Sequence, residues 1–88
     1  SVIDNKEFSE AFNIYPNPLT QNTIVTFDNL NNNKHQLILY DIIGKKIRSY
    51  FTNTDQIIIN RNGLSKGIYF YKFLKENEQL LTGKLVID

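Results

Sequence analysis

The sequence predicts an all-β domain, either a sandwich or a barrel, on the strength of three observations. Short runs rich in Ile, Val, Tyr, Phe and Thr recur about every 8–12 residues, which is the usual strand spacing in such folds. Clusters of Gly, Asn and Asp separate the runs, and these residues favour turns. No helical periodicity is sustained along the chain.

Seven runs are predicted as strands. The first, "AFNIY", is an edge or entry strand that stops at Pro16 and Pro18, because proline has no amide hydrogen and sits badly inside a sheet. The residue before a proline is kept out of the helical region, so the chain leaves this strand as a stiff bend toward the second run, "TIVTFD". The seven runs cover residues 11–15, 23–28, 35–41, 46–52, 56–60, 67–75 and 80–87.

Alternation assigns the faces of the remaining strands. "HQLILYD" and "GIYFYKFLK" are apolar on both faces, which favours either a central place in a sheet or partial cover by a neighbouring segment. "KIRSYFT", "QIIIN" and "LLTGKLVI" complete the set. The predicted core collects one face of each strand with a few apolar residues from the connections. It consists of Ile14, Val25, Phe27, Leu30, Leu37, Leu39, Ile47, Ile57, Ile59, Leu64, Tyr69, Tyr71, Phe73 and Leu85.

Four connections carry turn chemistry. In "DIIG" the Asp41 side chain can accept from the backbone two residues on, and Gly44 can take the positive φ that ends such a turn. "NLNNN" (29–33) is an asparagine-rich loop, "RNGLSKG" (61–67) is bounded by glycines, and "ENE" (76–78) closes the last hairpin.

Length and composition restrict the possible functions. The 88 residues fit one domain, and 41% hydrophobic and 22% charged residues are ordinary for a globular protein. A net charge of +1 with scattered basic residues argues against nucleic acid and anionic membranes, which select a concentrated basic surface. The one basic cluster, Lys45, Lys46 and Arg48, is interpreted as a solvated turn. The lack of cysteine excludes disulfides and zinc–thiolate sites, and no apolar run is long enough to span a membrane.

No catalytic or cofactor-binding constellation is recognisable. His35 opens the third run without a second histidine or a cysteine, which favours a surface or strand-end role. There is no calcium loop, and the glycines of "GLSKG" precede no helix that could bind phosphate. Most aromatic residues fall on alternating positions, which leaves Tyr40 and Tyr50 as the tyrosines expected to be exposed. We therefore predict no enzyme, no cofactor and no metal.

Four motifs in order carry a resemblance: "YPNP" (15–18), "LYDIIGKKI" (39–47), "LSKGIYFYKF" (64–73) and "GKLVI" (83–87). Together they resemble the type IX secretion system C-terminal sorting domain, type A, also called the Por secretion sorting domain, of Bacteroidota. The resemblance covers about Phe12 to Asp88. The matching positions are Tyr15, Pro16, Asn17, Pro18, Asp41, Gly44, Leu64, Gly67, Tyr69, Gly83, Lys84, Leu85 and Val86.

The resemblance implies an immunoglobulin-like sandwich of about seven antiparallel strands and a role as a secretion signal. Its cargo would pass through the periplasm, be exported by the type IX translocon and its shuttle proteins, and end at the cell surface or in the medium. A sortase-like cysteine peptidase usually removes the domain. On this reading residues 1–10 are a linker from an upstream cargo, residues 11–88 are the sorting domain, and the domain is a monomer.

The part of the domain that carries the signal is expected near the C-terminal strand. There "GKLVID" combines a basic side chain with an apolar strand that could pair at a sheet edge. Two other functions remain open at this point. One is a carbohydrate-binding or adhesive β-sandwich module that uses Tyr40 and Tyr50, and the other is an inert spacer of the fibronectin type.

Overall fold

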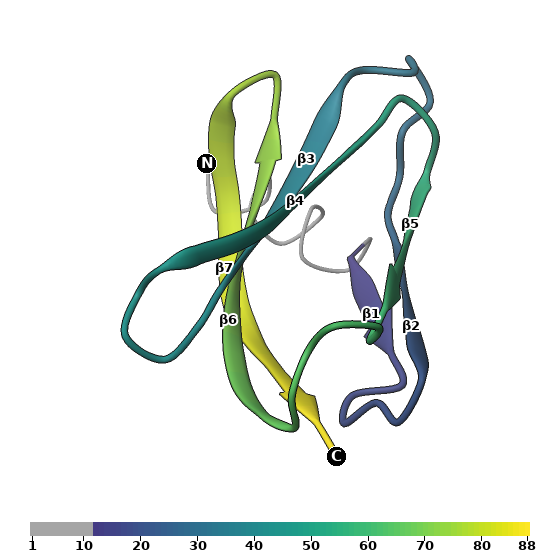
Figure 1. Ribbon diagram of the computed structural model, residues 1–88. Coiled ribbons are helices and arrows are strands. Elements are labelled where there is room, and N and C mark those ends of the chain that lie inside the picture. The colour runs from purple at the N-terminus through teal and green to yellow at the C-terminus, as the bar shows by residue number, and fades with distance from the viewer. Residues whose placement is uncertain (1–11) are drawn as a thin grey trace.

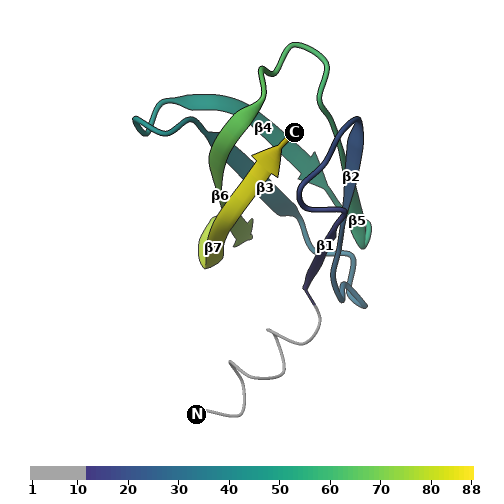
Figure 2. The same ribbon diagram turned by 90° about the horizontal axis from the view of Figure 1, so that it is seen from below.

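The computed structural model describes residues 12–88, which form two β-sheets packed face to face (Figures 1 and 2). All of the secondary structure in this part of the chain is strand and turn, as the sequence predicts. The strands are β1 (Asn13–Tyr15), β2 (Asn22–Thr26), β3 (His35–Tyr40), β4 (Lys46–Thr52), β5 (Gln56–Asn60), β6 (Gly67–Lys75) and β7 (Glu78–Ile87).

The strands are arranged as a sandwich of three on four. One sheet has the order β1-β2-β5 and the other has the order β4-β3-β6-β7, and all of these neighbours are antiparallel. The prediction of central positions for the third and sixth strands is confirmed, as is the edge position of β1. The fold is thus an immunoglobulin-like β-sandwich rather than a barrel.

Strand limits follow the predicted runs closely. Three strands, β4, β5 and β6, have the predicted limits, and the others differ by one to two residues at one or both ends. The second run continues past the end of β2, because the Phe27 amide donates to the Asp55 carbonyl at 3.1 Å. The predicted linker, residues 1–10, lies outside the described residues.

The turn after β3 forms as predicted. The Asp41 side chain accepts from the amides of Ile43 and Lys45 through Oδ1, at 3.1 and 2.8 Å, and the Gly44 amide donates to the Asp41 carbonyl at 3.0 Å. Gly44 has a φ of 91°, a value that residues with a Cβ rarely adopt. The side chain of Asp41 and the freedom of Gly44 therefore define this hairpin.

The core lies between the two sheets and contains most of the predicted residues. Ile14, Ile47 and Leu64 are partly buried and pack against it. Leu30 was predicted to be buried, but it is 95% exposed. Its neighbour Asn29 fixes the loop by donating to three backbone carbonyls, which leaves the Leu30 side chain in solvent. The buried hydrophobic residues are Leu19, Val25, Phe27, Leu37, Leu39, Ile57, Ile59, Tyr69, Tyr71, Phe73, Leu85 and Ile87.

His35 lies at a strand end, as expected, but it is buried rather than on the surface. Its ring packs against Phe27 and Phe73, with centroid distances of 4.6 and 5.4 Å, and its Nδ1 donates to the Asn33 carbonyl at 3.0 Å. Burial lowers the pKa of this imidazole below its usual value, which favours the neutral form. The histidine is thus an aromatic core residue.

Candidate functional site

The proline bend after β1 is held by a buried hydroxyl group. Thr23, fully buried in β2, donates its Oγ1 hydrogen to the Pro16 carbonyl at 2.7 Å. The Tyr15–Pro16 and Asn17–Pro18 peptide bonds are both cis. Since neither proline has an amide hydrogen, the bend offers few backbone donors of its own, and side chains supply the contacts that fix it.

Asn17 connects this bend to the last strand. Its Nδ2 donates to the Lys84 carbonyl at 2.9 Å, and its Oδ1 accepts from the Val86 amide at 3.0 Å. A primary amide offers the same donor and acceptor as a peptide group, so the Asn17 side chain takes the place of a neighbouring strand. Two of the resembling motifs, far apart in sequence, therefore meet through one side chain.

Leu19 continues this pairing along β7. Its amide donates to the Val86 carbonyl at 2.9 Å, and its carbonyl accepts from the Asp88 amide at 2.9 Å. The Leu19 side chain is fully buried in the core, which fixes the segment in place. We call residues 16–19 the proline clamp. Figure 1 shows it beside the end of β7, at the lower pole of the sandwich.

The clamp changes the expectation for the C-terminal strand. β7 is an edge strand, as predicted, but the outward backbone groups near its end are not open to a partner. Asn17 and Leu19 occupy the Lys84 carbonyl, both groups of Val86 and the Asp88 amide. Strand addition at this end of β7 would first have to displace the clamp.

Arg61 closes the same pole from the other side. Its backbone amide donates to the Gln21 carbonyl at 2.8 Å, and its guanidinium donates to the carbonyls of Thr20 and Asp88 at 3.1 and 2.5 Å. The clamp, the loop after β5 and the end of β7 thus form one hydrogen-bonded unit. Sequence reasoning gave Arg61 no role, because its partners lie far away along the chain.

Gly83 owes its identity to the side chain opposite it. It pairs with Tyr71 across β6 and β7, and a Cβ at Gly83 would lie 2.3 Å from the Tyr71 hydroxyl oxygen. The buried Tyr71 ring fills the space above the glycine, and burial raises the pKa of its hydroxyl. Of the other residues in this motif, Leu85 is buried, Val86 is half-buried and Lys84 is exposed.

The motif around Tyr69 fixes the corner that leads into β6. The Tyr69 hydroxyl donates to the Ser65 carbonyl at 2.6 Å, an arrangement that matches the tyrosine corner of immunoglobulin-like sandwiches. Gly67 opens β6 with φ of 145°, and Leu64 packs partly against the core. These residues stabilise the fold. Tyr69 is buried, Leu64 is partly buried, and Gly67 has no side chain to offer a partner.

The predicted site residues thus fall into three places. The clamp brings Pro16, Asn17 and Pro18 together with "GKLV", whereas Asp41, Gly67 and Tyr69 line a hollow of about 190 Å³. Gly44 lies in the turn of Asp41, and Leu64 packs against the core just before β6. Tyr15 belongs to neither group. It is 72% exposed on the outer face of the three-stranded sheet, where it pairs with Ile24.

The tyrosines proposed for carbohydrate binding do not form a platform. Tyr40 and Tyr50 were expected to be exposed, but both are half-buried. Tyr50 packs against the core, and the ammonium group of Lys72 lies 5.2 Å from the centre of the Tyr40 ring. Arg48 does not belong to a solvated turn, which corrects the sequence prediction. It lies in β4 and donates to the carbonyls of Asn60 and Asn62, which joins the two sheets.

Residues 12–88 contain no group of three or more His, Asp or Glu side chains arranged to hold a metal ion. In the same part of the chain, no helix is long and apolar enough to cross a membrane. Neither observation assigns a function.

Comparison with known proteins identifies the family. A search among curated proteins found no match. A family model described as secretion system C-terminal sorting domain matches residues 13–88, which is most of the chain. This family provides the C-terminal sorting signal of the type IX secretion system and is not known as an enzyme family. With a match over seven strands and all four motifs, the chain belongs to the secretion system C-terminal sorting domain family.

Proposed function

We propose that this chain is a type A sorting domain from Bacteroidota that directs an upstream cargo across the outer membrane. The cargo passes through the periplasm, the translocon and its shuttle proteins bind the folded domain, and the cargo reaches the cell surface or the medium. The family match over residues 13–88 supports the sorting role. The finer steps rest on the motifs that the chain shares with type A domains.

The surface that the secretion machinery reads is the proline clamp together with the end of β7. One observation carries this proposal: Asn17 joins the "YPNP" motif to the "GKLV" motif through hydrogen bonds to Lys84 and Val86. Both motifs are therefore parts of one surface, which forms only when the domain has folded. A machine that binds this surface would accept folded domains and reject unfolded ones.

Removal of the domain follows export. Residues 1–10 form a polar, acidic linker between the cargo and the domain, which begins at residue 11, and a sortase-like cysteine peptidase cuts in or just before this linker. The domain acts as a monomer. N-terminal sequencing of the released fragment tests the position of the cut, and a cut beyond Tyr15 would contradict it.

A reporter fusion tests the function as a whole. The 88-residue chain is placed at the C-terminus of a reporter that is exported to the periplasm of a type IX-competent cell. We expect the reporter at the cell surface or in the medium, and in the periplasm of a strain without the secretion system. Retention in the competent strain, while a known sorting domain exports the same reporter, would overturn the proposal.

A further inference from the structure

The outer face of the four-stranded sheet exposes an apolar strip. Phe70 and Ile68 of β6 are 44% and 45% exposed, and Ile42, in the turn after β3, is 69% exposed. Exposed apolar residues that are grouped on one sheet face are candidates for an interaction surface. None of these side chains belongs to the proline clamp.

The register of the sheet places this strip between two lysines. Tyr40 pairs with Lys46 of β4 and with Phe70 of β6, and Phe70 pairs with Lys84 of β7. Paired residues share a face. The register of β3 and β4 shifts at Tyr40, but Ile47 packs against the core and Lys46 is exposed, so one row across all four strands consists of Lys46, Tyr40, Phe70 and Lys84. Lys72 adds a third ammonium group above the Tyr40 ring.

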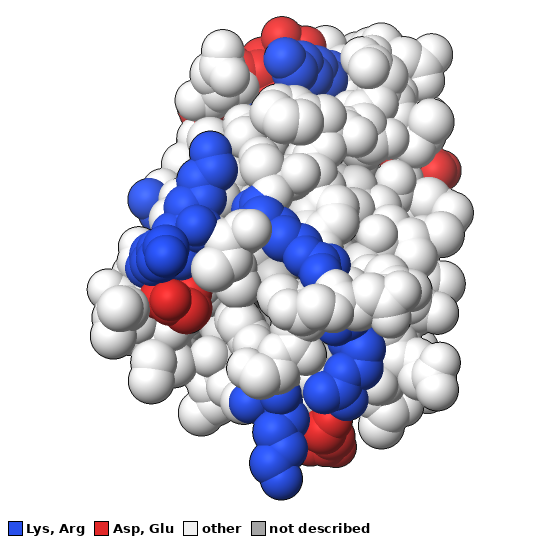
Figure 3. All heavy atoms as spheres, viewed as in Figure 1, with Lys and Arg blue, Asp and Glu red and all other residues white. Residues whose placement is uncertain are grey.

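Charge on this face is one-sided. Strands β3, β4 and β6 contain no acidic residue, and β7 contains only Glu78, at the opposite end from Lys84. Residues 12–88 carry nine basic and six acidic side chains, a net charge of +3, although the whole chain has a net charge of +1. In Figure 3 basic side chains outnumber acidic ones on the visible surface.

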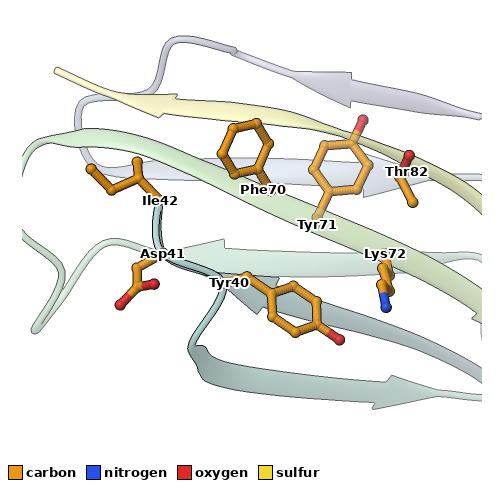
Figure 4. A pocket seen from close by; sticks show the side chains of 8 residues that line it. Tyr40, Asp41, Ile42, Phe70, Tyr71, Lys72 and Thr82 are labelled. Atoms are coloured by element: carbon orange, nitrogen blue, oxygen red, sulfur yellow. The ribbon is translucent and has the colours of Figure 1, made fainter.

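A hollow lies beside the row. Its volume is about 310 Å³, and its lining includes Tyr40, Ile42, Phe70, Lys72 and Thr82. Figure 4 shows the Tyr40 and Phe70 rings on opposite sides of it, with Ile42 at one end and Lys72 at the other. The carboxylate in the lining, Asp41, is engaged by the amides of its own turn. The hollow can therefore accept an apolar side chain between cationic neighbours.

We propose that this face binds an extended acidic peptide segment of the form acid–x–apolar–x–acid. Three strand spacings separate β4 from β7, which is about 14 Å. In an extended peptide, residues i, i+2 and i+4 face the same side, and i and i+4 are about 13 Å apart. The two acidic side chains would pair with Lys46 and Lys84, while the apolar side chain enters the hollow between Tyr40 and Phe70.

Charge decides among the possible occupants. A second copy of the same face would place its lysines against these lysines, which opposes a symmetric dimer through this surface. An anionic bilayer could attract the three lysines, but it offers no carboxylates at a fixed spacing. The paired spacing and the hollow both favour a peptide segment.

The test is a titration of the ¹⁵N-labelled 88-residue chain with the peptide Gly-Glu-Ser-Leu-Ser-Glu-Gly, followed by NMR. We expect the amide signals of Lys46, Phe70 and Lys84 to shift, and the shifts to shrink when the peptide's Leu is replaced by Ser or its Glu residues by Gln. Lys46→Glu and Lys84→Glu should each weaken binding about fivefold to tenfold, because an attraction becomes a repulsion. Lys75→Glu, with the same charge change outside this face, is the matched control.

Several outcomes would overturn the proposal. These are shifts that lie elsewhere, equal binding of the Leu and Ser peptides, and equal loss in the Lys75→Glu control. Lysine-dependent binding to anionic phospholipid vesicles without peptide binding would assign the face to a membrane, and self-association at rising concentration would assign it to a second copy. Thermal melts of each variant show that it is folded. The assay needs no secretion machinery. The peptide-binding proposal can therefore be wrong while the sorting function is correct, and it can be correct while the sorting function is wrong.

Discussion

Replacement of Asn17 by alanine should loosen the C-terminal strand. The substitution removes the hydrogen bonds to the Lys84 carbonyl and the Val86 amide. A neutral hydrogen bond contributes about 0.5–1.5 kcal/mol net, and at this exposed position water replaces part of the loss. We therefore expect the free energy of unfolding to fall by about 1–2 kcal/mol, which lowers the melting temperature of a domain of this size by about 4–16 °C.

Hydrogen exchange locates this loss. The Val86 amide donates to Asn17 in the native domain, so its exchange should accelerate about tenfold or more in Asn17→Ala. The Leu85 amide is an internal reference, because alternation along β7 directs it toward Tyr69 of β6. Asn31→Ala, in an exposed loop, is the matched control.

Asn17→Asp separates the contributions of the two hydrogen bonds that the Asn17 side chain makes. An aspartate keeps the acceptor for the Val86 amide but places an anionic oxygen where Nδ2 now donates to the Lys84 carbonyl. It should therefore be less stable than Asn17→Ala at neutral pH and recover part of the difference below about pH 4, where the carboxyl is protonated. Unchanged exchange at Val86 in Asn17→Ala would refute the role of Asn17 as a substitute strand.

Three further predictions concern the fold. Gly83→Ala should destabilise the domain by about 1–3 kcal/mol, because the new Cβ meets Tyr71. In denaturant unfolding, the double variant Gly83→Ala/Tyr71→Leu should lose less stability than the two single variants lose together. Additive losses would contradict this. The lowered pKa of His35 means that the unfolded chain binds the proton more tightly, so stability should be full above pH 6.5 and fall as the pH is lowered below that value. Melts between pH 7.5 and 5 should show this loss in the native chain and less of it in His35→Phe, and parallel curves would count against it. Gly44→Val should cost about 1–3 kcal/mol in a chemical denaturation curve, because φ there is 91°, although no atom lies within 4 Å of the added Cβ; an unchanged midpoint would contradict the strain.

Local chemistry made much of the fold predictable. The turn at Asp41 and Gly44 depends on residues within one hairpin, and alternation in "QIIIN" gives both the limits of β5 and its buried face. Leu30 shows where such reasoning fails. An apolar residue among asparagines suggests a core contact, but Asn29 ties the loop through backbone carbonyls of remote residues.

The site was predictable only in part, because its contacts are distant in sequence. Between two prolines, Asn17 reads as a turn residue, and its partners lie at the far end of the chain. Leu19 lies in no strand pattern, yet it is fully buried and pairs with β7. In the sequence, Gly83 suggests a flexible position. Only the register of β6 and β7 shows that the Tyr71 ring leaves no room for a Cβ there.

The proposal that the clamp and the end of β7 form the signal is tested most directly by secretion at matched stability. Asn17→Ala and Gly44→Val are expected to destabilise the domain by overlapping amounts, about 1–2 and about 1–3 kcal/mol, but only Asn17 belongs to the clamp. Secretion of the reporter fusion is measured for both variants and plotted against their melting temperatures. We predict that Asn17→Ala loses much more secretion than Gly44→Val for the same loss of melting temperature. If both variants fall on one line, the clamp contributes stability alone, and the signal lies on another surface.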